Sequence, residues 1–129
     1  MIAVVVFHKN PLSARLRLLR FTDGGLIGPD RPDGPVSEET PEGVVPTHPG
    51  ETCVRLAVAF GQAPAAFKCH APALVWFGDA PVFAVECTAF DPPEALAAKG
   101  DWIEFPEVRS LGPDDRTAAR ALYGRVMGS

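Results

Sequence analysis

Residues 40–61, TPEGVVPTHPGETCVRLAVAFG, decide how this chain folds, because their second half has two readings. As a helix, residues 52–60 have Thr52 as an N-cap and Gly61 just beyond the last turn. As a strand, they alternate larger apolar side chains on one face with small residues and Arg55 on the other. The alternation favours the strand, and the helix stays open as the alternative.

The segments around this stretch predict strands. Residues 67–77 and 82–90 are apolar runs on either side of GDAP, and they predict a β-hairpin. Residues 1–8 and 14–21 predict a second hairpin, and residues 102–105 predict a short last strand. Most of the regular structure is therefore expected to be β.

Residues 116–127, RTAARALYGRVM, predict a C-terminal helix, because Ala118, Leu122 and Val126 form an apolar stripe with helical spacing. Residues 28–50 are dense in proline, glycine and acidic residues and predict a long loop. The order of elements predicts a single α+β domain over the 129 residues, mostly a mixed β sheet with a C-terminal helix. A small all-β barrel or sandwich with a C-terminal helix is the alternative.

Composition limits the classes of partner. Apolar residues make up 47% of the chain and charged residues 22%, which is enough to build a core. The net charge of −4 argues against a nucleic-acid partner, which would favour a basic face. No apolar run approaches the roughly 18 residues of a membrane span, and MIAVVVFHKN lacks the features of a signal peptide. We therefore expect a cytoplasmic protein, with Cys53, Cys69 and Cys87 as free thiols.

Two motifs, PEGVVPTHPGET at residues 41–52 and GDWIEFPEVRSL at residues 100–111, together with the order of elements, resemble the Nudix hydrolase family. In that family a loop and the helix after it carry the signature G-x5-E-x7-R-E-U-x-E-E-x-G-U, in which U is a bulky apolar residue. The carboxylates on that helix hold Mg²⁺, which neutralises a diphosphate and helps to activate a water. The resemblance implies a Nudix-like fold.

The chain departs from the signature at the residues that hold the metal. Gly43 corresponds to the signature glycine and Glu51 to its first glutamate, but seven residues separate them where the family has five. Counted from Glu51, the arginine falls at Ala59 and the metal-binding pair at Ala63 and Pro64. No register supplies the carboxylate cluster, so the resemblance is to a degenerate Nudix box, and Mg²⁺ is expected only if the chain is hydrolytic.

The resemblance and the position of acids and aromatics on the expected elements give a set of candidate site residues. The candidate catalytic acids are Glu51 and Glu86. The candidate ligand contacts are Gly43, His48, Trp102 and Phe105, with the aromatic rings available to stack on a base. The metal ligands, if a metal site exists, are Glu51, Glu104 and Glu107.

Three functions follow from these patterns. The first is a Nudix-like domain that binds a nucleotide or nucleoside diphosphate derivative with little or no hydrolysis. The second is a metal-dependent diphosphate hydrolase that uses acids outside the box. The third is a protein-interaction module that uses the long loop or the face of Arg15, Arg17 and Arg20, and exposed strand edges would favour a homodimer.

Overall fold

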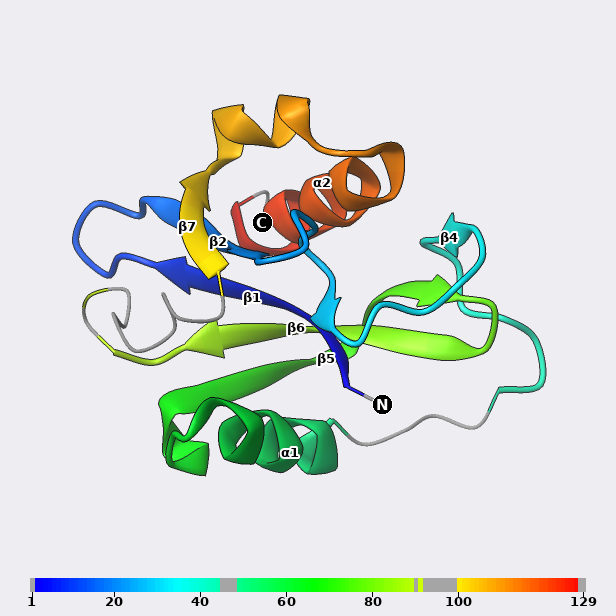
Figure 1. Ribbon diagram of the computed structural model, residues 1–129, viewed down its shortest axis with the longest axis horizontal. Helices are drawn as coiled ribbons and strands as arrows, with labels where there is room; N and C mark the ends of the chain where they lie inside the picture. Colours follow the sequence, from blue (N-terminus) through cyan, green and yellow to red (C-terminus); the bar gives the residue numbers. More distant parts are fainter. Residues whose placement is uncertain (1, 45–48, 90, 92–99, 128–129) are drawn as a thin grey trace.

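A mixed β sheet lies between two helices in the computed structural model, which describes residues 2–44, 49–89, 91 and 100–127 (Figure 1). The strands are β1 (Ala3–Lys9), β2 (Leu16–Phe21), β3 (Gly28–Pro29), β4 (Val36–Ser37), β5 (Phe67–Phe77), β6 (Ala80–Cys87) and β7 (Gly100–Glu104). The helices are α1 (Gly50–Phe60) and α2 (Pro113–Met127), with short 3-10 turns η1 (Pro64–Ala66) and η3 (Phe105–Ser110). The expected α+β class, with a mixed sheet and a C-terminal helix, is confirmed.

The sheet is built around β1. Its strands follow the order β4-β5-β6-β1-β2-β7, and β3 pairs with β1 beside this path. The β1–β6 pair is parallel, with Val5 opposite Ala84, and the other pairs are antiparallel. Both predicted hairpins, β1–β2 and β5–β6, are therefore confirmed. The second hairpin turns more tightly than expected, at Gly78 and Asp79 alone.

Residues 52–60 form most of α1, so the favoured strand prediction was wrong and its helical alternative is correct. Its buried residues are Cys53, Leu56, Ala57 and Phe60, which is the i, i+3, i+4, i+7 spacing of one helix face. The strand prediction was wrong because it placed Val54 and Val58 on the same apolar face as Leu56, whereas they lie on the opposite face of the helix. Val54 and Val58 are 50% and 77% exposed.

The two helices begin earlier than the sequence predicts, and α1 ends at the predicted glycine. The helix α1 begins at Gly50, and Pro49 takes the N-cap position that the sequence assigned to Thr52. Gly61 ends α1 as expected, because a φ of +65° places it in the left-handed region that glycine adopts without strain. The helix α2 begins three residues before the predicted start, at Pro113, since proline is well tolerated in a first helical turn.

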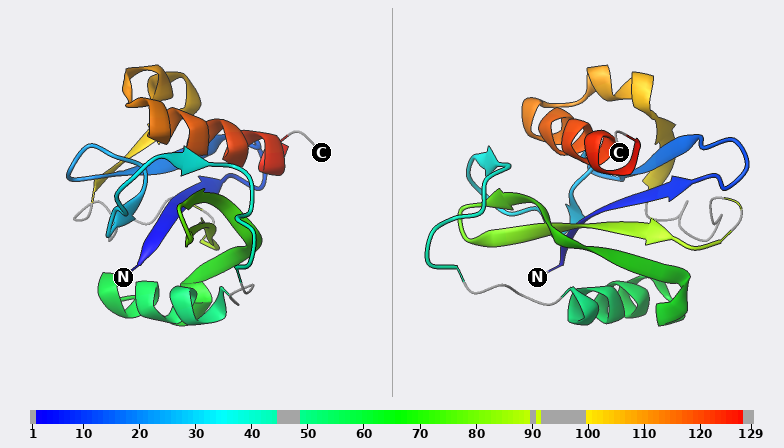
Figure 2. Two further views of the ribbon diagram at one scale, coloured as in Figure 1. Left: turned by 90° about the vertical axis from the view of Figure 1, so that its right-hand side faces the viewer. Right: turned by 180° about the vertical axis from the view of Figure 1, so that it is seen from behind.

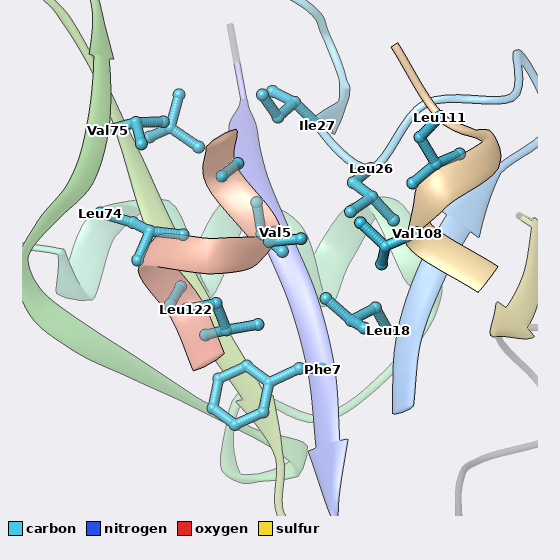
Figure 3. Close-up of a cluster of buried hydrophobic side chains, with 14 of the residues drawn as sticks. Val5, Phe7, Leu18, Leu26, Ile27, Leu74, Val75, Val108, Leu111 and Leu122 are labelled. Atoms are coloured by element: carbon cyan, nitrogen blue, oxygen red, sulfur yellow. The ribbon is translucent and has the colours of Figure 1, made fainter. Parts of the chain in front are cut away.

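Each face of the sheet carries its own apolar core, and one helix covers each face (Figure 2). Along β1, Val4 and Val6 belong to the cluster under α1, while Val5 and Phe7 belong to the cluster under α2. Figure 3 shows the α2 cluster, in which Leu122 of α2 lies with Phe7. Burial on both faces explains why β1 reads as a continuous apolar run and not as an alternating one.

The stretch before β4 is tied to α2 by a buried carboxylate. The Oδ1 atom of Asp115 accepts hydrogen bonds from the backbone N–H of Leu26 at 3.2 Å and from the Arg31 guanidinium at 2.7 Å. Arg31 also lies 3.8 Å from Asp114 and 5.9 Å from the centre of the Phe77 ring. Across the described ranges, no helix is both long enough and apolar enough to cross a membrane.

Candidate functional site

The two candidate catalytic acids lie on opposite faces of the sheet. Glu51 is in the first turn of α1, where it is exposed and paired with Arg55 at 2.6 Å. Glu86 is on β6 between Val85 and Cys87, which both belong to the α1-side core, so its own side chain is on the α2 side. There the carboxylate of Glu86 lies 2.9 Å from Nε2 of His70. A single active site cannot use both acids directly in this arrangement.

The acids at the end of β7 are held by local structure. Glu107 accepts a hydrogen bond from the backbone N–H of Glu104 at 2.6 Å and forms part of the capping box of η3. Glu104 is also paired with Arg15 of the β1–β2 connection. Glu51 is on α1, which packs on β5, whereas β7 follows β2 at the other end of the sheet. Among the residues with described positions, no three His, Cys, Asp or Glu side chains gather as metal ligands would.

The candidate ligand contacts are also dispersed. Phe105 packs on Tyr123 of α2, with ring centres 4.5 Å apart, and Trp102 lies at the edge of the α1-side core with its ring 6.5 Å from that of His8. Gly43 is in a turn with a φ of +74°, a conformation that favours glycine. His48 lies outside the described residues.

An apolar hollow on the α1 side of the sheet comes from an irregularity in β5. The pairing of β5 with β6 shifts register between His70 and Val75, and Pro72 lies in that bulge. A proline has no N–H to donate to the ladder, so it is found at such positions. The bulge is fixed from α2, because Arg125 donates hydrogen bonds to the carbonyl oxygens of Pro72 at 2.7 Å and Ala73 at 3.1 Å.

This bulge forms one wall of a cleft of about 440 Å³. Pro72 and Ala73 line it together with Trp76 of β5 and Phe83 of β6, and Val44 closes it from the loop that precedes α1. The lining is apolar and aromatic, and the volume is within the roughly 300–1,000 Å³ of small-molecule pockets. We call it the aromatic cleft.

A smaller and more polar cleft of about 220 Å³ adjoins it. Glu51, Thr52 and Arg55 of α1 line this second cleft opposite Ala3 and Phe83 of the sheet. Phe83 borders both clefts, so the two lie next to each other. We call the second one the helix cleft. Among its described lining residues the one cation is Arg55, which is engaged with Glu51.

The three cysteines lie on the α1 side of the sheet. Cys53, Cys69 and Cys87 are free, and all three belong to or border the α1-side core. Burial raises the pKa of the Cys87 thiol to about 12, and the nearby charge of Glu86 adds to the shift. Burial also raises the pKa of Cys69 well above its usual range, with Cys53 as a further cause. Because the thiolate is the reactive form, these two groups are poor nucleophiles at neutral pH.

Sequence reasoning missed Trp76 and Phe83, since both looked like ordinary core residues of the predicted hairpin. The available signal was Pro72, a proline inside an apolar strand run, which is typical of a bulge. Compared with protein-family models and with curated proteins, the chain matches none.

Proposed function

We propose that the two clefts beside α1 bind a nucleotide or a nucleoside diphosphate derivative with little or no hydrolysis. The observation that carries this proposal is the shared Phe83 ring, which joins an apolar cleft to a polar one. The base lies in the aromatic cleft against Trp76 and Phe83, where stacking is favourable. The phosphates lie in the helix cleft, where Thr52 and Arg55 supply hydrogen-bond donors.

A Nudix-like origin is part of this proposal. It is supported by the position of α1, which begins within the PGET segment, at Gly50, and packs on the sheet as the helix of that family would. The absence of efficient hydrolysis is supported by the composition of α1, whose one acidic residue is Glu51. Mg²⁺ needs several oxygen ligands in octahedral geometry, and one exposed carboxylate supplies too few.

The test is a titration of the protein with a nucleoside diphosphate and with the matching nucleoside, with and without Mg²⁺, followed by calorimetry. Thr40 lines the aromatic cleft from an exposed loop position, so Thr40→Trp should fill the cleft without disturbing the sheet. We expect this variant to bind both compounds at least tenfold more weakly. Binding that is unchanged in Thr40→Trp would exclude the aromatic cleft.

A matched pair of variants tests the helix cleft. Arg55→Gln and Glu51→Gln break the same ion pair, but only the first removes the cation. We expect Arg55→Gln to weaken diphosphate binding about tenfold and to leave nucleoside binding unchanged. Glu51→Gln should bind the diphosphate at least as tightly as the parent protein. Rapid Mg²⁺-dependent turnover that disappears in Glu51→Gln would instead identify a working hydrolase.

A further inference from the structure

We propose that a separate cleft between η3 and α2 binds a phosphate monoester that carries an aromatic or apolar group. This cleft has a volume of about 290 Å³ and lies on the other side of the sheet from α1, where η3 runs beside α2 (Figure 1). Three of its lining residues are arginines, and the other three are apolar. The lining is formed by Phe105, Pro106, Val108, Arg109, Arg116 and Arg120. The inference is independent of the function proposed for the clefts beside α1.

The three arginines of this cleft have no partners in the described part of the chain. Five other arginines, all outside this cleft, form ion pairs or donate hydrogen bonds to carbonyl groups. These are Arg15, Arg20, Arg31, Arg55 and Arg125. Among the described arginines only Arg17 is otherwise unpaired, so the free guanidinium groups are concentrated around one cleft.

The acids closest in sequence do not neutralise this cluster. Asp114 and Asp115, which precede Arg116, are both directed to Arg31. Glu107 of η3 accepts the backbone N–H of Glu104. The cluster therefore keeps its positive charge, although the protein as a whole has a net charge of −4.

The positions of Arg116 and Arg120 oppose the stability of α2. Arg116 is in the first turn, where the helix dipole disfavours a cation. Arg120 is four residues later, so two like charges are neighbours on the helix surface. A bound dianion would relieve both repulsions, and the planar guanidinium fork matches the geometry of phosphate oxygens.

The remaining lining indicates what the phosphate is attached to. Val108 is buried, and Phe105 is half-buried against Tyr123, so the cleft has an apolar part of its lining, the apolar floor, as well as the arginines. Inorganic phosphate would leave this floor uncovered, whereas an aryl group would cover it. The bounded volume fits a small ligand better than a peptide or a nucleic-acid strand.

The experiment is a calorimetric titration with phenyl phosphate, inorganic phosphate and phenol as probes. We expect phenyl phosphate to bind at least tenfold more tightly than either of the other two. Arg116→Gln and Arg120→Gln should each weaken it about tenfold, and Phe105→Leu should reduce the advantage of phenyl phosphate over inorganic phosphate. Circular dichroism of each variant establishes that it is folded.

Two controls separate this site from general charge effects and from the clefts beside α1. Arg17→Gln removes an unpaired arginine outside the cleft, and Arg55→Gln removes the cation of the helix cleft. Both should bind phenyl phosphate as the parent protein does. Equal losses in Arg17→Gln and Arg120→Gln, or binding of an oligonucleotide or a phosphopeptide in the absence of any phenyl phosphate binding, would overturn the proposal.

Discussion

The two faces of one sheet present clefts of different character, and part of the difference follows from the signs of neighbouring charges on the two helices. On α1, Arg55 is four residues after Glu51, and the pair neutralises itself at 2.6 Å. On α2, the same spacing joins Arg116 to Arg120, so the charges add. Among the described residues, the helix cleft beside α1 therefore has one cation, which Glu51 engages, while the cleft beside α2 has three arginines without a partner. At the same spacing of four residues, opposite charges thus neutralise each other on α1 and like charges add on α2.

The substitutions with the largest expected effect test whether the two cores contribute independently to the free energy of unfolding. Leu56 and Leu122 are fully buried in the α1-side and α2-side cores. Leu56→Ala and Leu122→Ala should each lower the free energy of unfolding by about 2–5 kcal/mol, because each leaves a cavity. The sheet lies between the two sites, so the losses should add to within about 0.5 kcal/mol in the double variant.

Chemical denaturation of the four proteins measures this additivity. If the double variant is unfolded in buffer, Leu56→Val and Leu122→Val test the same additivity with smaller losses of stability. A coupling energy well above 1 kcal/mol would mean that the two cores behave as one, and the division into two faces would fail.

A smaller effect is expected at the contact that belongs to the α2 face alone. Asp115→Asn keeps an acceptor for the N–H of Leu26 but removes the charge that faces Arg31. We expect a loss of about 2–3 kcal/mol, since the Asp115 side chain is only 8% exposed. Asp114→Asn is the matched control, because its contact with Arg31 is 3.8 Å long and exposed. It should cost less than about 0.5 kcal/mol in thermal unfolding, and equal losses would contradict the burial argument.

The smallest effect has the opposite sign. Arg116→Glu replaces a cation in the first turn of α2 by an anion and converts a repulsive pair with Arg120 into an attractive one. The free energy of unfolding should rise by about 0.5–1 kcal/mol at low salt and by less in 1 M salt. The same substitution should abolish binding of phenyl phosphate. A loss of stability would show instead that the stem of Arg116 contributes packing to the cleft.

The sequence predicts the parts of this fold that depend on local pattern. The hairpins are recognisable from apolar runs with turn residues between them, and α2 from its stripe around Ala118 and Leu122. The helix α1 is harder, because its small residues and valines satisfy two periods at once. The burial of Leu56 and the exposure of Val58 show that the helical period is correct. Burial is a property of the assembled fold, so the local sequence does not reveal it.

The clefts depend still more on tertiary structure. The spacing of Arg116 and Arg120 is visible in the sequence, but Arg109 joins them only because η3 runs beside α2. The contact between His70 and Glu86 likewise requires the register of β5 on β6. No spacing rule gives either arrangement, since each is fixed by the way separate elements pack.

The contact between Arg31 and Asp115 has a consequence for the order in which the chain acquires its structure during synthesis. The two residues are 84 positions apart, and the α2-side core also needs Leu122. The buried residues of the α1-side core have all been made once Cys87 has left the ribosome. Because synthesis adds about 5–20 residues per second, the α2 side of the sheet then stays uncovered by α2 for a further few seconds. A nascent chain at that stage exposes one apolar face of a nearly complete sheet, which is the kind of surface that chaperones hold.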